Sequence, residues 1–232
     1  MSDSGGNLIS NLATLNERIE QACMASGRSR EAVKLMAVTK RFPLEVAASA
    51  VEAGLTLLGE NRIQEAVEKI EKAPFHARWE LIGHLQSNKA QLAAKHFDAI
   101  QSVDSIKLAR RLDRFAGEFG KVLPILLQVN TGEDAGKFGF KTEHTETAME
   151  QILHLPSIKV EGLMTIAPLP STLESAKVAF DKLRELRDRL AEKTARDLPE
   201  LSMGMSGDLE PAIAAGSTCI RVGSALFGQR PV

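Results

Sequence analysis

Short apolar segments alternate with longer amphipathic segments along most of the chain, and this alternation is the strongest structural signal in the sequence. The apolar segments are rich in β-branched residues and are bounded by polar or turn residues, a pattern typical of buried strands in a parallel sheet. The predicted strands are residues 35–39, 55–58, 79–82, 97–102, 123–130, 160–165, 201–203 and 219–222.

Helical patterns fill the intervals between these strands. A first helix is predicted over residues 8–24, where apolar residues recur at helical spacing and Gly27 ends the pattern. The other predicted helices are residues 44–53, 63–72, 88–95, 106–119, 145–153, 173–196 and 209–214.

Eight strands that alternate with helices predict an α/β protein, a single (β/α)8 TIM barrel with an additional N-terminal helix. A doubly wound open sheet is the alternative. Its dinucleotide-binding form carries G-x-G-x-x-G after the first strand, and residues 39–43 lack that motif. No linker or internal repeat divides the chain, so we expect one domain over residues 1–232, with the N-terminal helix within 1–28 and the barrel over 34–230.

Charge and composition exclude several classes of partner. Lys and Arg total 29 against 30 for Asp and Glu, so no basic excess supports nucleic-acid binding. No apolar run approaches the ~20 residues that span a bilayer, so we expect no membrane association, and the N-terminus does not resemble a signal peptide. The two cysteines, Cys23 and Cys219, have neither metal-ligand nor redox spacing, so we expect no metal site and a reducing, cytoplasmic location.

A lysine, Lys40, directly follows the first predicted strand. An ammonium group at the end of an apolar strand must be solvated, paired or used chemically. The chemical use is a Schiff base, because partial burial lowers the pKa of a lysine and frees its amine to attack a carbonyl. Taken alone, Lys40 fits an ordinary solvated lysine better, and the other strand ends decide between the two.

Polar or glycine residues follow nearly every other predicted strand. In a TIM barrel such positions meet at one mouth, where functional groups collect. They include Glu60, Asn61, His84, Asp104 and Asn130. A single residue of this kind is more often structural, since Asn61 also fits a helix cap and His84 a structural histidine.

Small residues dominate the predicted loops after the seventh and eighth strands, with Ser206 and Gly207 in one and Gly223 and Ser224 in the other. Small residues let backbone N–H groups approach an anion, and barrels often bind phosphate between these two loops. Two tight turns without a ligand are the alternative. By strand alternation, Arg221 points into the barrel, where a cation needs a partner. An amine, a phosphate cradle and an arginine together suit pyridoxal 5′-phosphate (PLP), an aldehyde that bears a phosphate.

Motifs spread over residues 34–230 closely resemble those of the pyridoxal phosphate homeostasis proteins, the PLP-binding barrels also called the proline synthetase co-transcribed type. No single motif is specific, but the combination is. The matching segments are AVTK at 37–40, GEN at 59–61, LIGHLQSNK at 81–89, QVN at 128–130, KFG at 137–139, GLM at 162–164, LSMGMS at 201–206 and RVGSALFG at 221–228.

The resemblance implies a barrel related to the N-terminal domain of alanine racemase, with PLP joined as an internal aldimine to Lys40. Arg221 matches the arginine that faces the pyridine nitrogen, and Asn61 and His84 match residues near the cofactor. The positions that match the family's phosphate-binding residues are Ser206, Gly207, Gly223 and Ser224. The family often has threonine at position 224, and position 207 is variable, so only the backbone N–H of Gly207 carries over.

Two functions from different classes fit this site. Racemases of the related fold use a lysine and a tyrosine, and the tyrosine comes from a second domain; this chain contains no tyrosine and shows no such domain after the eighth strand. Arg221 would also keep the pyridine nitrogen unprotonated, which weakens PLP as an electron sink. We therefore expect a non-catalytic, monomeric protein that buffers PLP and delivers it to apo forms of PLP-dependent enzymes. A PLP-dependent enzyme of the alanine racemase-like class is the alternative, and a PLP-free Schiff-base aldolase is a more distant one.

Overall fold

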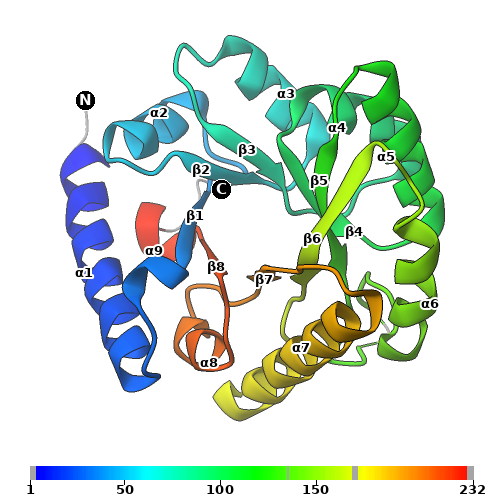
Figure 1. Cartoon of the computed structure of the whole chain (residues 1–232). Helices are drawn as coiled ribbons and strands as arrows, with labels where there is room; N and C mark the ends of the chain where they lie inside the picture. Colours follow the sequence, from blue (N-terminus) through cyan, green and yellow to red (C-terminus); the bar gives the residue numbers. More distant parts are fainter. Residues whose placement is uncertain (1–3, 135, 169–171, 229–232) are drawn as a thin grey trace.

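A computed structural model describes residues 4–134, 136–168 and 172–228 of the chain. Eight parallel strands form a closed barrel in chain order, and β8 closes it by pairing with β1 (Figure 1). The strands are β1 (Lys34–Val38), β2 (Leu57–Glu60), β3 (Arg78–Leu81), β4 (Ala99–Val103), β5 (Leu123–Gln128), β6 (Ile158–Met164), β7 (Glu200–Ser202) and β8 (Cys219–Val222). The predicted (β/α)8 barrel is confirmed.

Helices surround the barrel and follow the strands in turn (Figure 1). They are α1 (Ser4–Ala25), α2 (Leu44–Glu52), α3 (Ile63–Lys72), α4 (Ala90–His96), α5 (Ile106–Glu118), α6 (Thr142–Ile152), α7 (Leu173–Thr194), α8 (Leu209–Ala214) and α9 (Ser224–Phe227), with 3-10 turns η1 (Arg30–Ala32) and η2 (Ser87–Lys89). No helix among the described residues is long and apolar enough to span a membrane.

The N-terminal helix α1 packs outside the barrel against α8 and α9 (Figure 1). Its apolar face is buried, as at Leu15. Asn11 Nδ2 donates to the carbonyl of Leu226 at 2.9 Å, and Arg18 Nη2 donates to the carbonyl of Ser206 at 3.2 Å. Helix α1 therefore contacts the loop that follows β7 and the helix α9 that follows β8.

Two apolar clusters stabilise the barrel. The larger cluster fills the layer between the sheet and the helices. A smaller cluster, made of Met36, Val38, Ile82 and Cys219, lies inside the barrel. Along β1, inward-facing residues alternate with outward-facing ones. Met36 and Val38 are inward positions of β1, and the next position at the same two-residue spacing is Lys40.

One strand differs from its predicted position in a way that affects the site. The apolar pattern predicts a strand over residues 55–58, whereas β2 spans Leu57–Glu60. Gly54 adopts φ +88°, and the Leu55 N–H donates to the carbonyl of Ala50 at 2.9 Å, so Leu55 still belongs to the end of α2. Glu60 is therefore the last residue of the strand and not part of the loop at the mouth.

Candidate functional site

Lys40 and Asn61 lie together at the carboxyl end of the barrel. Lys40 is half-buried and comes two residues after Val38, which faces the barrel interior. A cavity of about 160 Å³ adjoins it and is lined by Lys40, Arg41, Asn61, Arg62 and Glu65. Two of the predicted site residues, Lys40 and Asn61, thus line one small cavity.

The loops after β7 and β8 meet through their serines. Ser224 Oγ donates to Ser206 Oγ at 3.2 Å, and the Ala225 N–H donates to the same oxygen at 3.4 Å. A Cβ built on Gly223 would come 3.1 Å from the carbonyl oxygen of Val38, so this loop lies tightly against β1, whereas one built on Gly207 would meet nothing within 4 Å. Hydroxyls and backbone groups of both loops are therefore collected beside the strand that leads to Lys40, with open space at Gly207.

Arg221 points into the barrel, as strand alternation predicts, and is only 4% exposed. Its Nη1 donates to Ser202 Oγ at 2.7 Å and its Nη2 donates to the carbonyl of Thr165 at 2.8 Å. Both acceptors are neutral, and burial lowers the pKa of the Arg221 guanidinium below its usual value. An arginine in this position can direct a cationic donor at a ligand while it stays anchored to β7 and to the residue that follows β6.

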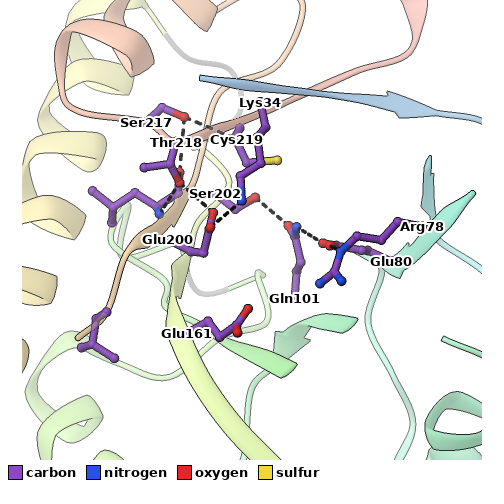
Figure 2. Close-up of polar contacts among 12 residues, drawn as sticks. Lys34, Arg78, Glu80, Gln101, Glu161, Glu200, Ser202, Ser217, Thr218 and Cys219 are labelled. Atoms are coloured by element: carbon purple, nitrogen blue, oxygen red, sulfur yellow. Dashed lines mark hydrogen bonds and ion pairs between the residues drawn. The ribbon is translucent and has the colours of Figure 1, made fainter. Parts of the chain in front are cut away.

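A chain of hydrogen bonds runs from Arg221 through the barrel interior, and Figure 2 shows its part from Ser202 through Gln101 and Glu80 to Arg78. Ser202 Oγ donates to Gln101 Oε1 at 2.6 Å, and Gln101 Nε2 donates to Glu80 Oε2 at 2.6 Å. Arg78 Nε donates to Glu80 Oε1 at 2.6 Å. The buried guanidinium is thus connected through neutral groups to a carboxylate at the amino end of the barrel.

The larger cavity, of about 540 Å³, lies at that amino end and not at the predicted site. Four of the charged side chains around it form ion pairs: Lys34 with Glu200, and Arg78 with Glu80 (Figure 2). Cys219 also lines it, and burial raises the pKa of its thiol to about 12, which leaves the thiol unreactive. Judged by cavity volume alone, the binding site would lie at this amino end. The amine of Lys40 and the hydroxyl and N–H donors of the serine loops place the candidate site at the carboxyl end instead.

His84 lies at the rim of the mouth with partners of its own. A hydrogen bond of 2.8 Å joins His84 Nδ1 and Asp104 Oδ2, and the imidazole stacks on the ring of Phe138 with centroids 3.6 Å apart. These contacts fix the orientation of the ring. His84 is thereby placed with Asp104 and Phe138.

Sequence reasoning missed a buried charged cluster behind Lys40. Lys69 Nζ, on α3, donates to the carbonyl of Thr39 at 2.9 Å, to Glu60 Oε1 at 2.8 Å and to Glu65 Oε1 at 3.0 Å. Thr39 Oγ1 donates to the same Glu60 oxygen at 2.7 Å. Burial raises the pKa of the Glu60 carboxyl, against the opposing effect of Lys69.

The prediction that Glu60 contributes a polar group to the mouth is therefore wrong. Its side chain faces the layer between sheet and helices and is fully buried there. A signal for this was present in α3, where Lys69 comes three residues after Ala66 and six after Ile63, both buried. A lysine on the buried stripe of an amphipathic helix needs a carboxylate partner in the same layer.

The residues at the mouth match the chemistry of PLP. An aldehyde needs a primary amine, a phosphate needs hydroxyl and N–H donors with room for its oxygens, and a buried pyridine nitrogen needs a donor. Lys40, the two serine loops and Arg221 supply one of each. Among the described residues, no group of three or more His, Cys, Asp or Glu side chains is arranged to hold a metal ion.

Comparisons with known proteins define the class first. Residues 10–231 match the family described as alanine racemase, N-terminal domain. The alanine racemase of Clostridium difficile 630 shares this fold, with a TM-score of 0.78 at 18% identity over 98% of this chain and 58% of that one.

Closer relatives define the family. The pyridoxal phosphate homeostasis protein of Vibrio cholerae is 40% identical over 95% of each chain. The structure of PipY from Synechococcus elongatus PCC7942 with PLP bound has a TM-score of 0.84 and 37% identity, and covers 95% of this chain and all of its own. The chain belongs to the pyridoxal phosphate homeostasis protein family.

Proposed function

We propose that this protein binds PLP covalently at Lys40 and serves to buffer and deliver it, without catalytic turnover. The observation that supports this proposal most strongly is that one end of the barrel carries the lysine that follows β1, two serine loops that touch each other, and a buried arginine. The PLP-bound structure of PipY and the names of the relatives support the same ligand.

Each residue has a distinct part in this proposal. PLP supplies an aldehyde that condenses with a primary amine with loss of water, and Lys40 Nζ provides that amine. Arg221, a permanent cation, donates toward the pyridine nitrogen and keeps it unprotonated. Asn61 and His84 contact the cofactor from the rim. The residues that hold the phosphate are Ser206, Gly207, Gly223 and Ser224.

A carrier role is favoured over an enzyme role by what the chain offers a substrate. No tyrosine exists in its 232 residues to act as the second base of a racemase. The relatives are named as homeostasis proteins. One observation favours the alternative, a PLP-dependent enzyme of the alanine racemase-like class: the His84–Asp104 pair has the form of an oriented general base.

The proposed function also leads to expectations about the partners of the protein and its location in the cell. We expect a monomeric single domain that passes PLP to apo forms of PLP-dependent enzymes and binds neither nucleic acid nor membranes. Cys23 and Cys219 are both free and buried, which suits the reducing cytoplasm.

Absorbance of the purified protein tests the cofactor. We expect a band near ~420 nm, typical of lysine-bound PLP, and borohydride should fix PLP on the peptide that contains Lys40. A protein that PLP cannot colour, or a label on another lysine, would refute the site.

Turnover of a panel of L- and D-amino acids separates the two functions. The PLP-loaded protein should act far below the typical enzyme kcat of about 10 s⁻¹. It should instead transfer PLP to an apo-enzyme in a mixed assay. Racemisation or transamination at an enzyme-like rate, lost in Lys40→Ala, would establish the enzyme reading.

A further inference from the structure

We infer that Lys69 and Glu65, on α3, are positioning residues that fix the backbone on both sides of Lys40. The inference rests on the proposed function, since it takes Lys40 as the residue that links PLP. Glu65 lines the small cavity beside Lys40, but neither Glu65 nor Lys69 is among the residues expected to touch the cofactor.

Lys40 occupies the second position of a tight turn. The Phe42 N–H donates to the carbonyl of Thr39 at 3.1 Å, which closes a four-residue turn over Lys40 and Arg41. Arg41 adopts φ +64°, a left-handed conformation that glycine or asparagine usually fills and that costs energy for an arginine. Such a conformation persists only where surrounding contacts impose it.

Helix α3 supplies those contacts, one to each peptide group that flanks Lys40. Lys69 Nζ donates to the carbonyl of Thr39, which is the peptide before Lys40, at 2.9 Å. The Arg41 N–H, which is the peptide after Lys40, donates to Glu65 Oε1 at 2.5 Å. Lys69 also donates to that same Glu65 oxygen, so the two contacts are joined.

The cluster is anchored from the other side by β2. Lys69 is 7% exposed, and its ammonium has three hydrogens and three oxygen acceptors, from Thr39, Glu60 and Glu65. Glu60 is fully buried, and its Oε2 has no hydrogen-bond partner among the described residues. A lysine whose every donor is used, against a carboxylate that cannot reach water, has little freedom to move.

Rigid placement of this turn matters for covalent linkage more than for binding. The phosphate is held by the loops after β7 and β8, so the aldehyde is presented at a fixed place. Lys40 Nζ reaches it only if the turn directs the side chain there, and misplacement by about 1 Å can slow such a reaction by up to ~10²-fold. Loss of the α3 contacts should therefore slow linkage while leaving PLP bound through its phosphate.

A matched pair at Glu65 tests the inference. Glu65→Gln keeps an oxygen acceptor for the Arg41 N–H, whereas Glu65→Leu removes it; Lys69→Arg and Lys69→Met form a second pair. Each full-length variant is mixed with PLP, and two rates are followed: the rise of absorbance near ~420 nm and the borohydride-dependent label on Lys40. Total bound PLP is measured separately. Thr145→Val, which removes a buried hydroxyl on α6, is the control for a general loss of stability.

We expect linkage to slow at least ~10-fold in Glu65→Leu and to stay within about twofold of wild type in Glu65→Gln and Thr145→Val. Total bound PLP at saturation should be unchanged. Equal rates in Glu65→Leu and wild type would overturn the inference, as would equal slowing in Glu65→Gln. If Lys69→Met does not fold, the partly exposed Glu65 pair still decides. A wild-type protein that fixes no PLP on Lys40 would instead overturn the proposed function, and the inference with it.

Discussion

The two ends of the barrel both carry ion pairs, but the pairs differ in how far their side chains are exposed to solvent. At the carboxyl end, the Glu60–Lys69 pair lies behind Lys40 with side chains 0% and 7% exposed. At the amino end, Lys34 and Arg78 pair with glutamates around the larger cavity while their own side chains stay 53% and 47% exposed. Solvated pairs contribute little to stability, whereas a buried pair leaves an uncompensated charge when one partner is removed.

This difference in burial indicates which end of the barrel has the more rigid backbone. The buried pair touches the backbone of the turn that carries Lys40, while the exposed pairs can exchange partners with water at little cost. A large cavity with adjustable charges is a weaker indication of a covalent site than a small one with a rigid wall.

Removal of the linking amine should have the largest effect. Lys40→Ala should abolish the ~420 nm band, because Lys40 supplies the amine of the proposed linkage. Residual PLP affinity should remain, since charge-assisted hydrogen bonds to phosphate contribute about 1.5–3 kcal/mol each. Absorbance and titration calorimetry on the same sample measure the two effects, and an unchanged spectrum would remove Lys40 from the site.

Charge removal at the two ends should differ clearly in stability. Lys69→Met should lower the free energy of unfolding by about 3–5 kcal/mol, because it strands the buried Glu60. Lys34→Met should lower it by less than about 1 kcal/mol, because that pair is half solvated. Urea unfolding of both variants measures the difference, and similar losses would show that burial does not separate the two ends.

The Glu60 carboxyl should make stability depend on pH. Burial holds its pKa above the usual value of about 4.3, so the folded protein retains this proton to higher pH than the unfolded chain does. Its contribution to stability is then complete below about pH 4.3 and is lost as pH rises through the raised pKa. Glu60→Gln should abolish that part of the slope, and parallel stability curves for the two proteins would contradict the raised pKa.

The smallest effect is expected from Arg78 at the amino end. Arg78→Met should change PLP affinity by less than about twofold, because Arg78 is half-exposed and only neutral groups connect Glu80 to Arg221. A larger change would show that the hydrogen-bonded chain couples the two ends. Fluorescence or absorbance titration with PLP is sufficient, with Lys34→Met as the control.

Most of the fold and the layout of the mouth could be predicted from the sequence. The alternation of strand and helix patterns defines the barrel, and period-two alternation places Arg221 inside it. Lys40, Asn61 and the two serine loops could be found because they lie within three residues of the carboxyl ends of predicted strands. They lie at the same end of the barrel because the carboxyl ends of all strands in a parallel barrel lie there, and the strand–helix pattern of the sequence predicts that topology.

The contacts behind the mouth could not be predicted in the same way. Lys69 belongs to a helix with several charged residues, and a lysine there is usually solvated. Its burial depends on β2 starting at Leu57, two residues later than the apolar pattern indicates, because Leu55 is held by the end of α2. Arg221 and Gln101 bond to side chains on other strands, and alternation gives the direction of each side chain but not its partner.

The packing of α1 against α8 and α9 has a consequence for biosynthesis. The ribosome makes α1 well before α8 and α9, and it makes β1 well before β8, the strand with which β1 pairs. The barrel can close only after residues through Phe227 have emerged, so closure is a late event with little help from local contacts. Both serine loops belong to that last segment, and a nascent chain therefore presents Lys40 long before it can retain a phosphate.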